Sequence, residues 1–244
     1  MLLGLTGTLV NGGGILVGGI AGMMRTPLTI AQESYLKLGL GVFTVYYGLR
    51  LTILNLNGPF VRGMKELVIL LLALVVGRLL GRLFRIQEAS NEIGRIAREK
   101  IAAASGGQQG PPDDGFKICA ALFCVAPLGI VGSAEDGLAE YYYPLVVKAV
   151  MDGLAAMAMV RLFGWSVLFS AVPVVAVQGT IGLLCAARLR PFLEAHAILE
   201  PVNALAGIVV FAIALVVLQI KKIPLSDYLP GLVVAPLLAW FWGW

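Results

Sequence analysis

Charged side chains interrupt two otherwise apolar stretches of this chain. Glu135 and Asp136 follow the glycine-rich run at 129–133, and Lys148 and Asp152 stand four residues apart on the next apolar stretch. On insertion scales a charge at the centre of a bilayer costs at least about 2.5 kcal/mol, so such residues usually mark a substrate or ion path. These four side chains are therefore the first candidates for function.

The run Gly129-Ile130-Val131-Gly132-Ser133 predicts a broken helix end, because glycine costs about 1 kcal/mol relative to alanine within a helix. Unwound carbonyl groups beside Glu135 and Asp136 would suit a hard cation or a proton. The alternative is a helix that ends at the outer surface with solvated acids. Tyr141-Tyr142-Tyr143 would then form an interfacial aromatic belt.

Lys148 and Asp152 fall on one helical face and can neutralise each other. They are either a switchable ion pair lining a cavity or a structural pair near the end of a span. Asn11 and Gln178 are amides in apolar segments, where they either bond helices together or face a substrate. With Ser133 and Asn203 added, the candidate substrate- or ion-binding residues are Asn11, Ser133, Glu135, Asp136, Lys148, Asp152, Gln178 and Asn203.

Composition identifies an all-α polytopic membrane protein. Of the 244 residues 59% are hydrophobic and only 13% are charged, and the mean hydropathy is +0.90. Soluble domains carry about 25% charged residues. A span needs roughly 20 apolar residues. Eight candidate spans follow: Leu2 to Met24, Leu36 to Leu54, Glu66 to Phe84, Ile118 to about Ser133, Leu145 to Phe163, Trp165 to Ala187, Val202 to Ile220 and Leu229 to Trp244.

The long polar tract after the third span sets the predicted topology. Apolar residues recur at three- and four-residue steps from Ile86 to Ile101, which indicates an amphipathic helix, and residues 105–115 read as a flexible linker. Basic residues gather in this tract, which places it in the cytoplasm and the N-terminus outside. No basic region precedes the first apolar run, so we expect that run to stay as a span. If the fourth segment is re-entrant, seven spans remain.

Similar patterns in the two halves of the chain predict an inverted repeat. Matching residues are Gly13 and Gly179, Ile15 and Ile181, and Gly41 and Gly207, and two intervening spans would put the halves in opposite orientation. The predicted organisation is one transmembrane domain, 1–244. It comprises a first repeat at 1–85, a cytoplasmic helix and linker at 86–115, central helices at 116–164 and a second repeat at 165–244.

Five motifs resemble a bacterial membrane family catalogued as domain of unknown function 554, which includes the YqgA-like proteins. They are Gly7-Thr8-Leu9-Val10-Asn11 with its glycine-rich continuation, the run from Pro127 to Ser133 leading into Asp136-Gly137-Leu138, Lys148 with Asp152-Gly153, Gln178-Gly179, and Leu229-Pro230. They cover essentially the whole chain in order. The resemblance implies a multi-pass plasma-membrane protein described as a transporter, without an established substrate. Arg78 and Arg82 depart from the family's tendency towards an acidic residue at the end of the third helix.

Several other functions lack a sequence basis. The chain has one histidine, too few for a histidine-based zinc site, and that residue would have to be the base of any activated nucleophile. The three cysteines show no Cys-x-x-Cys spacing. We therefore expect no bound metal, no cofactor and no enzymatic activity. The remaining enzymatic scheme is an intramembrane carboxylate pair, Asp136 and Asp152. The net charge of +4 reflects the excess of basic residues in cytoplasmic loops and not nucleic-acid binding. Small-xxx-small steps in residues 14–22 predict close helix packing, within the protomer or in a homodimer.

The sequence thus predicts a secondary transporter of the bacterial inner membrane that carries a small solute or ion. A passive channel would use the same polar lining without alternating access. A membrane scaffold would use the polar residues only to join helices.

Overall fold

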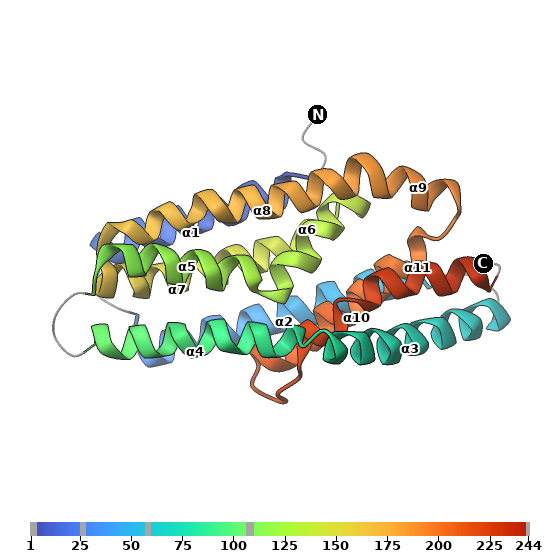
Figure 1. Ribbon diagram of the computed structural model, residues 1–244, viewed down its shortest axis with the longest axis horizontal. Coiled ribbons are helices and arrows are strands. Elements are labelled where there is room, and N and C mark those ends of the chain that lie inside the picture. Colours follow the sequence, from blue (N-terminus) through green and yellow to red (C-terminus); the bar gives the residue numbers. More distant parts are fainter. Residues whose placement is uncertain (1–3, 25–27, 57–59, 106–109, 243–244) are drawn as a thin grey trace.

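The computed structural model describes residues 4–24, 28–56, 60–105 and 110–242, and all regular structure within them is helical (Figure 1). The α-helices are α1 (Thr6–Met24), α2 (Ile30–Leu54), α3 (Phe60–Leu83), α4 (Ile86–Ala104), α5 (Pro112–Val125), α6 (Pro127–Ala139), α7 (Tyr143–Phe163), α8 (Ala171–Leu184), α9 (Arg190–Ala195), α10 (Leu199–Val217) and α11 (Gly231–Phe241). Short 3₁₀ turns at Gly164–Ser170 and Leu225–Tyr228 and a π-helical turn at Cys185–Leu189 complete the path. The outer ends of the first and last predicted spans, at Leu2 and Trp244, lie outside the described residues.

Three described helical stretches are long and apolar enough to cross a membrane: Thr6–Met24, Tyr143–Ala195 and Leu199–Val217. Two bent pairs raise the number to five if each pair is one span. The helices of the pair α3 and α4 meet at 59°, and those of α5 and α6 meet at 57°. The protein is therefore an all-helical membrane protein with several apolar helices.

The glycines of α1 allow this helix to lie directly against α7. A Cβ atom at Gly14 would stand 2.5 Å from the carbonyl oxygen of Ala149, and one at Gly22 would meet the backbone of Met157. Near the start of α1, Gly7 is closest to Leu145. Contacts that advance together along both helices make α1 and α7 parallel. The predicted small-residue packing is thus within the protomer.

The opposite side of α1 packs against α8, which runs in the other direction. Gly179 of α8 is close to Thr8, whereas Gly12 meets Val175, so the contacts move backwards along α8 as they move forwards along α1. The 53-residue stretch Tyr143–Ala195 therefore turns back on itself, at Gly164, whose φ of 76° glycine adopts readily. In Figure 1, α1, α7 and α8 lie side by side at one end of the molecule.

Two further helix pairs, α2 with α10 and α3 with α11, complete the molecule, and α3 and α11 lie at the end away from α1, α7 and α8 (Figure 1). In α2 and α10, Gly48 is closest to Phe211 and Gly207, whereas Gly41 meets Leu218 seven residues further along α10. Gly77 of α3 packs on Gly231 at the start of α11.

The predicted break in the fourth apolar segment occurs, but not at the glycines. Residues 129–133 are helical within α6, and the bend lies at Ala126, whose ψ of 125° is extended. A residue before proline is driven out of the helical region, and Pro127 has no N–H to continue the ladder. The expectation of unwound backbone at 129–133 was therefore wrong, because proline and not glycine decides where this helix breaks.

The amphipathic helix predicted from the polar tract is α4. Arg95 bonds to Glu92 and Glu99 on its exposed face, while Ala97 and Ala104 are buried. The predicted linker is shorter than expected, because α5 already begins at Pro112. Proline is well placed in the first turn of a helix, where its missing N–H has no intrahelical partner to lose. Linker residues 106–109 lie outside the described residues.

Candidate functional site

Four polar side chains from three helices form one buried network. The ammonium of Lys148 donates to both carboxylate oxygens of Asp152, at 2.8 and 2.6 Å. The amide nitrogen of Asn11 donates to Asp152 Oδ2 and to Gln178 Oε1, each at 3.1 Å. Exposed fractions are 0% for Asn11, 1% for Gln178, 2% for Lys148 and 6% for Asp152. The predicted ion pair is present, and the two amides bond α1 to α8, which is one of the two roles that the sequence left open for them.

The packing of α1 between α7 and α8 brings these residues together. Asn11 lies on α1, Lys148 and Asp152 lie on α7, and Gln178 lies on α8. The first turn of α6 covers the network from a fourth direction. A Cβ atom at Gly129 would stand 2.7 Å from Lys148 Cε and 2.9 Å from Gln178 Nε2, so only glycine fits there without displacing them.

The bend between α5 and α6 lies against the same ammonium group. Lys148 Nζ is 5.9 Å from the centre of the Phe123 ring, which precedes the bend, and Gly129 follows the bend. A cation facing an aromatic ring is stabilised by the negative potential of the ring face. The charged pair therefore sits beside a discontinuous helix, an arrangement in which helix termini can take part in binding.

Two polar atoms of the network have no hydrogen-bond partner among the described residues. They are Asn11 Oδ1 and Gln178 Nε2, one acceptor and one donor. The orientation of Asn11 follows from its neighbours, because an amide oxygen turned towards Asp152 would repel the carboxylate. Buried polar groups without partners cost free energy, so these two atoms are places where a polar ligand or water would be favoured.

Asp136 of α6 contacts the start of α1, about one helical turn before Asn11. Its Oδ2 accepts a hydrogen bond of 2.8 Å from the backbone N–H of Gly7, in the first turn of α1. A carboxylate at a helix N-terminus is stabilised by the free N–H groups and the helix dipole. Asp136 is 1% exposed, so the alternative of a solvated acid at the surface was wrong for it.

Glu135 is fully buried and stands apart from the network. Neither of its carboxylate oxygens has a hydrogen-bond partner among the described residues. On α6 it precedes Gly137, which packs against Gly182 and Cys185 at the π-helical turn. The solvated-acid alternative was wrong here as well. A buried carboxyl group without partners is either protonated, and so neutral, or it binds a cation.

The structure does not join Ser133 and Asn203 to the network. The hydroxyl of Ser133 donates to the carbonyl oxygens of Gly129 and Ile130, at 2.6 and 3.1 Å, and so is used within α6. Asn203 of α10 donates to the side-chain oxygen of Asn55, at 3.2 Å. It therefore connects α10 to the end of α2. Among the described residues, no group of three or more His, Cys, Asp or Glu side chains is placed to hold a metal.

Comparison with known proteins places this arrangement in a family. The family model described as "Protein of unknown function (DUF554)" matches residues 6–240. The chain belongs to the DUF554 family. The match contains every residue of the buried network, and it confirms the resemblance that the motifs carried.

Two full-length relatives of this DUF554 chain are described as uncharacterised. "Uncharacterized membrane protein YdfK" of Bacillus subtilis (strain 168) is 22% identical over 234 residues, which cover 95% of this chain and 94% of that protein. "Uncharacterized protein YqgA" of Escherichia coli (strain K12) is 25% identical over 249 residues, which cover 98% of each. No solved structure matches the chain significantly.

Other buried residues were missed by the sequence reasoning. Gly129 received no separate role, since only its spatial neighbours show that it makes room for Lys148. Glu66 and Asp227 are also buried, at 1% and 5% exposure. Glu66 could have been found as an acid at the edge of an apolar run. Asp227 accepts from the backbone N–H of Gln87, a contact across 140 residues that no local pattern predicts.

Proposed function

We propose that this DUF554 protein is a secondary transporter whose solute site is the network of Asn11, Lys148, Asp152 and Gln178. The observation that carries the proposal is the unused acceptor and donor on Asn11 and Gln178, buried beside a neutralised ion pair. A polar solute can bond to these atoms without breaking the pair. A charged solute can instead compete for Lys148 or Asp152, so either sign of substrate fits.

Helix directions support eight spans over seven. If the bent pair α5 and α6 were re-entrant, α7 would enter the membrane from the side opposite to α1 and run antiparallel to it. Gly14 packs on Ala149 and Gly22 on Met157, so the two helices are parallel. In the eight-span arrangement, α4 lies in the cytoplasm of a bacterial inner-membrane protein and the N-terminus lies outside.

The packing also supports the proposed inverted repeat. Such a repeat has a two-fold axis in the membrane plane, so each helix should be antiparallel to its counterpart. The counterparts α1 and α8, α2 and α10, and α3 and α11 are in contact, and the first two pairs are antiparallel by their glycine contacts. Asn11 and Gln178 then bond directly across the interface between the repeats. Substrate sites of inverted-repeat transporters lie at this kind of interface.

Glu135 is the proposed coupling residue, with a proton as its ion. An ionised carboxylate with no bonding partner is costly to bury, whereas its protonated form is not. Its position on α6, apart from the network, allows proton and solute to occupy different places. A passive channel would lack this coupling. A scaffold would bind neither the proton nor the solute.

A ligand screen on the purified protein tests the solute site. A compound that binds only the folded form raises the unfolding temperature. We expect a polar metabolite that stabilises the wild type but not Gln178→Ala, which removes the free donor. Asn203→Ala is the matched control, since this amide lies outside the network, and it should keep the response. A compound that stabilises Gln178→Ala and the wild type equally would place the site elsewhere.

A further inference from the structure

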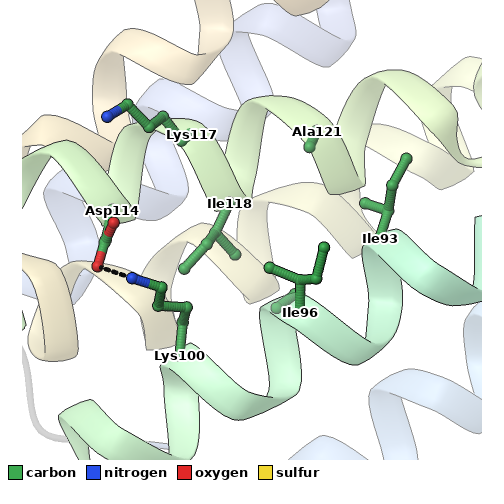
Figure 2. A pocket seen from close by; sticks show the side chains of 8 residues that line it. Ile93, Ile96, Lys100, Asp114, Lys117, Ile118 and Ala121 are labelled. Atoms are coloured by element: carbon green, nitrogen blue, oxygen red, sulfur yellow. Dashed lines mark hydrogen bonds and ion pairs between the residues drawn. The ribbon is translucent and has the colours of Figure 1, made fainter.

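A groove with a cavity volume of about 280 Å³ lies between α4 and α5, away from the buried network (Figure 2). Ile93 and Ile96 of α4 and Ile118 and Ala121 of α5 line its apolar part. Ile96 remains 45% exposed. The groove is therefore open and largely apolar, and it lies between the amphipathic helix α4 and helix α5.

One end of the groove is charged. Lys100 bonds to Asp114, with 2.8 Å between Nζ and Oδ2 (Figure 2). Lys117 also lines the groove, and in this view its side chain extends from α5 away from the pair. Lys117 forms no ion pair within the described parts of the chain. Figure 2 shows this charged end at one side and Ile93 with Ala121 at the other. Among the residues that line the groove, two ammonium groups face one carboxylate, which leaves an excess positive charge at this end.

We propose that this groove binds an anionic phospholipid, with an acyl chain along the isoleucines and the phosphate against Lys117 and Lys100. The arrangement matches such a lipid in both parts, since an acyl chain gains free energy for each buried methylene and a basic group near the membrane surface attracts anionic headgroups. A zwitterionic lipid would fill the trough but leave the excess positive charge uncompensated. A soluble anion would meet the lysines but leave the trough empty.

The location fits this occupant. Over its whole length α4 carries no net charge, because Glu88, Glu92 and Glu99 balance its three basic residues, so the positive charge is local to the end of the groove. The tract is predicted to lie on the cytoplasmic side, whose leaflet carries anionic lipids. A lipid held between α4 and α5 would fix the amphipathic helix to the membrane surface. The inference is independent of the proposed transport activity.

Native mass spectrometry of the full-length protein with phosphatidylglycerol and phosphatidylcholine of equal chain length tests the proposal. We expect phosphatidylglycerol to bind more tightly. Lys100→Gln with Lys117→Gln should weaken it by about fivefold per lysine. Ala121→Leu, which fills the trough, should weaken both lipids. The matched control is Lys221→Gln with Lys222→Gln, an equal loss of charge at exposed positions outside the groove, and it should leave the affinity unchanged.

Three results would overturn the proposal. Equal affinity for the two lipids would remove the role of the charged end, and an equal loss in the control variant would reduce the effect to overall charge. Displacement of phosphatidylglycerol by inorganic phosphate alone would make the groove an anion site without a lipid chain. Unfolding temperatures of all variants separate loss of lipid from loss of fold.

Discussion

Asn11 sets the geometry of the buried network because its one amide nitrogen donates to two acceptors. It holds Asp152 on α7 and Gln178 on α8 at the same time, each at 3.1 Å. Its own oxygen is left free. A single residue on α1 therefore couples the ion pair to the amide that offers a free donor.

Separating the ion pair should destabilise the protein more than removing it. In Asp152→Asn, Lys148 keeps its charge at 2% exposure and loses its counter-charge, which costs about 3–5 kcal/mol for buried pairs. The double variant Lys148→Met with Asp152→Leu leaves no unpaired charge and should recover most of that stability. Chemical denaturation in detergent micelles measures the difference.

The same double variant distinguishes a binding role from a structural one. If the pair serves only to join helices, the refolded double variant keeps ligand binding. If the pair is part of the solute site, binding is lost although the fold is stable. Equal instability of the single and double variants would contradict the electrostatic account of the network.

At the residue scale, the sequence predicted the pair but not its surroundings. The spacing of Lys148 and Asp152 by one helical turn is a local property, so their ion pair could be predicted. The tertiary contact of Asn11 with Gln178 was proposed only through the repeat. Ser133 was expected to bind a ligand, but buried hydroxyls commonly bond back to the preceding turn of their own helix, as this one does.

The site depends on the close packing of α1 against α7, because this packing places Asn11 opposite Asp152. Gly18 lies on this contact, where a Cβ atom would overlap the backbone of Gly153. Gly13, on the same helix, has open space at that position.

Gly18→Ala should therefore lower the unfolding temperature strongly, whereas Gly13→Ala should leave it unchanged or raise it slightly through better helix propensity. The two substitutions add the same methyl group to the same helix. Thermal unfolding followed by circular dichroism compares them. Equal effects of the two would mean that α1 and α7 are not in backbone contact.

The helices themselves were largely predictable, and their boundaries depended on proline and on capping. The amphipathic periodicity predicted α4, and the apolar runs predicted the cores of α1, α7 and α10. The bend was predicted at the glycines of 129–133, whereas Pro127 places it at Ala126. The early start of α2 at Ile30 follows from the capping box of Thr29 and Gln32, whose three-residue spacing is a local helix-start signal.

The whole molecule combines three helix pairs that join the first and last thirds of the chain. The pairs α1–α8, α2–α10 and α3–α11 connect segments more than 140 residues apart, and the central helices α6 and α7 fit between them (Figure 1). The sequence predicted these pairings only weakly, since apolar helices share composition whether or not they are related. The direction of each contact is a property of the assembled fold, and the inverted repeat that we propose rests on it.

Access to the network from both sides of the membrane tests the central claim most directly. In a background with Cys119, Cys124 and Cys185 replaced by Ala, Gln178→Cys would be treated with a membrane-impermeant thiol reagent in sealed vesicles of each orientation. We predict labelling from both sides, slowed by the ligand found in the screen. Glu140→Cys, at an exposed position, serves as the positive control for reagent and fold. A labelled control with no labelling at position 178 from either side would contradict a transport site there.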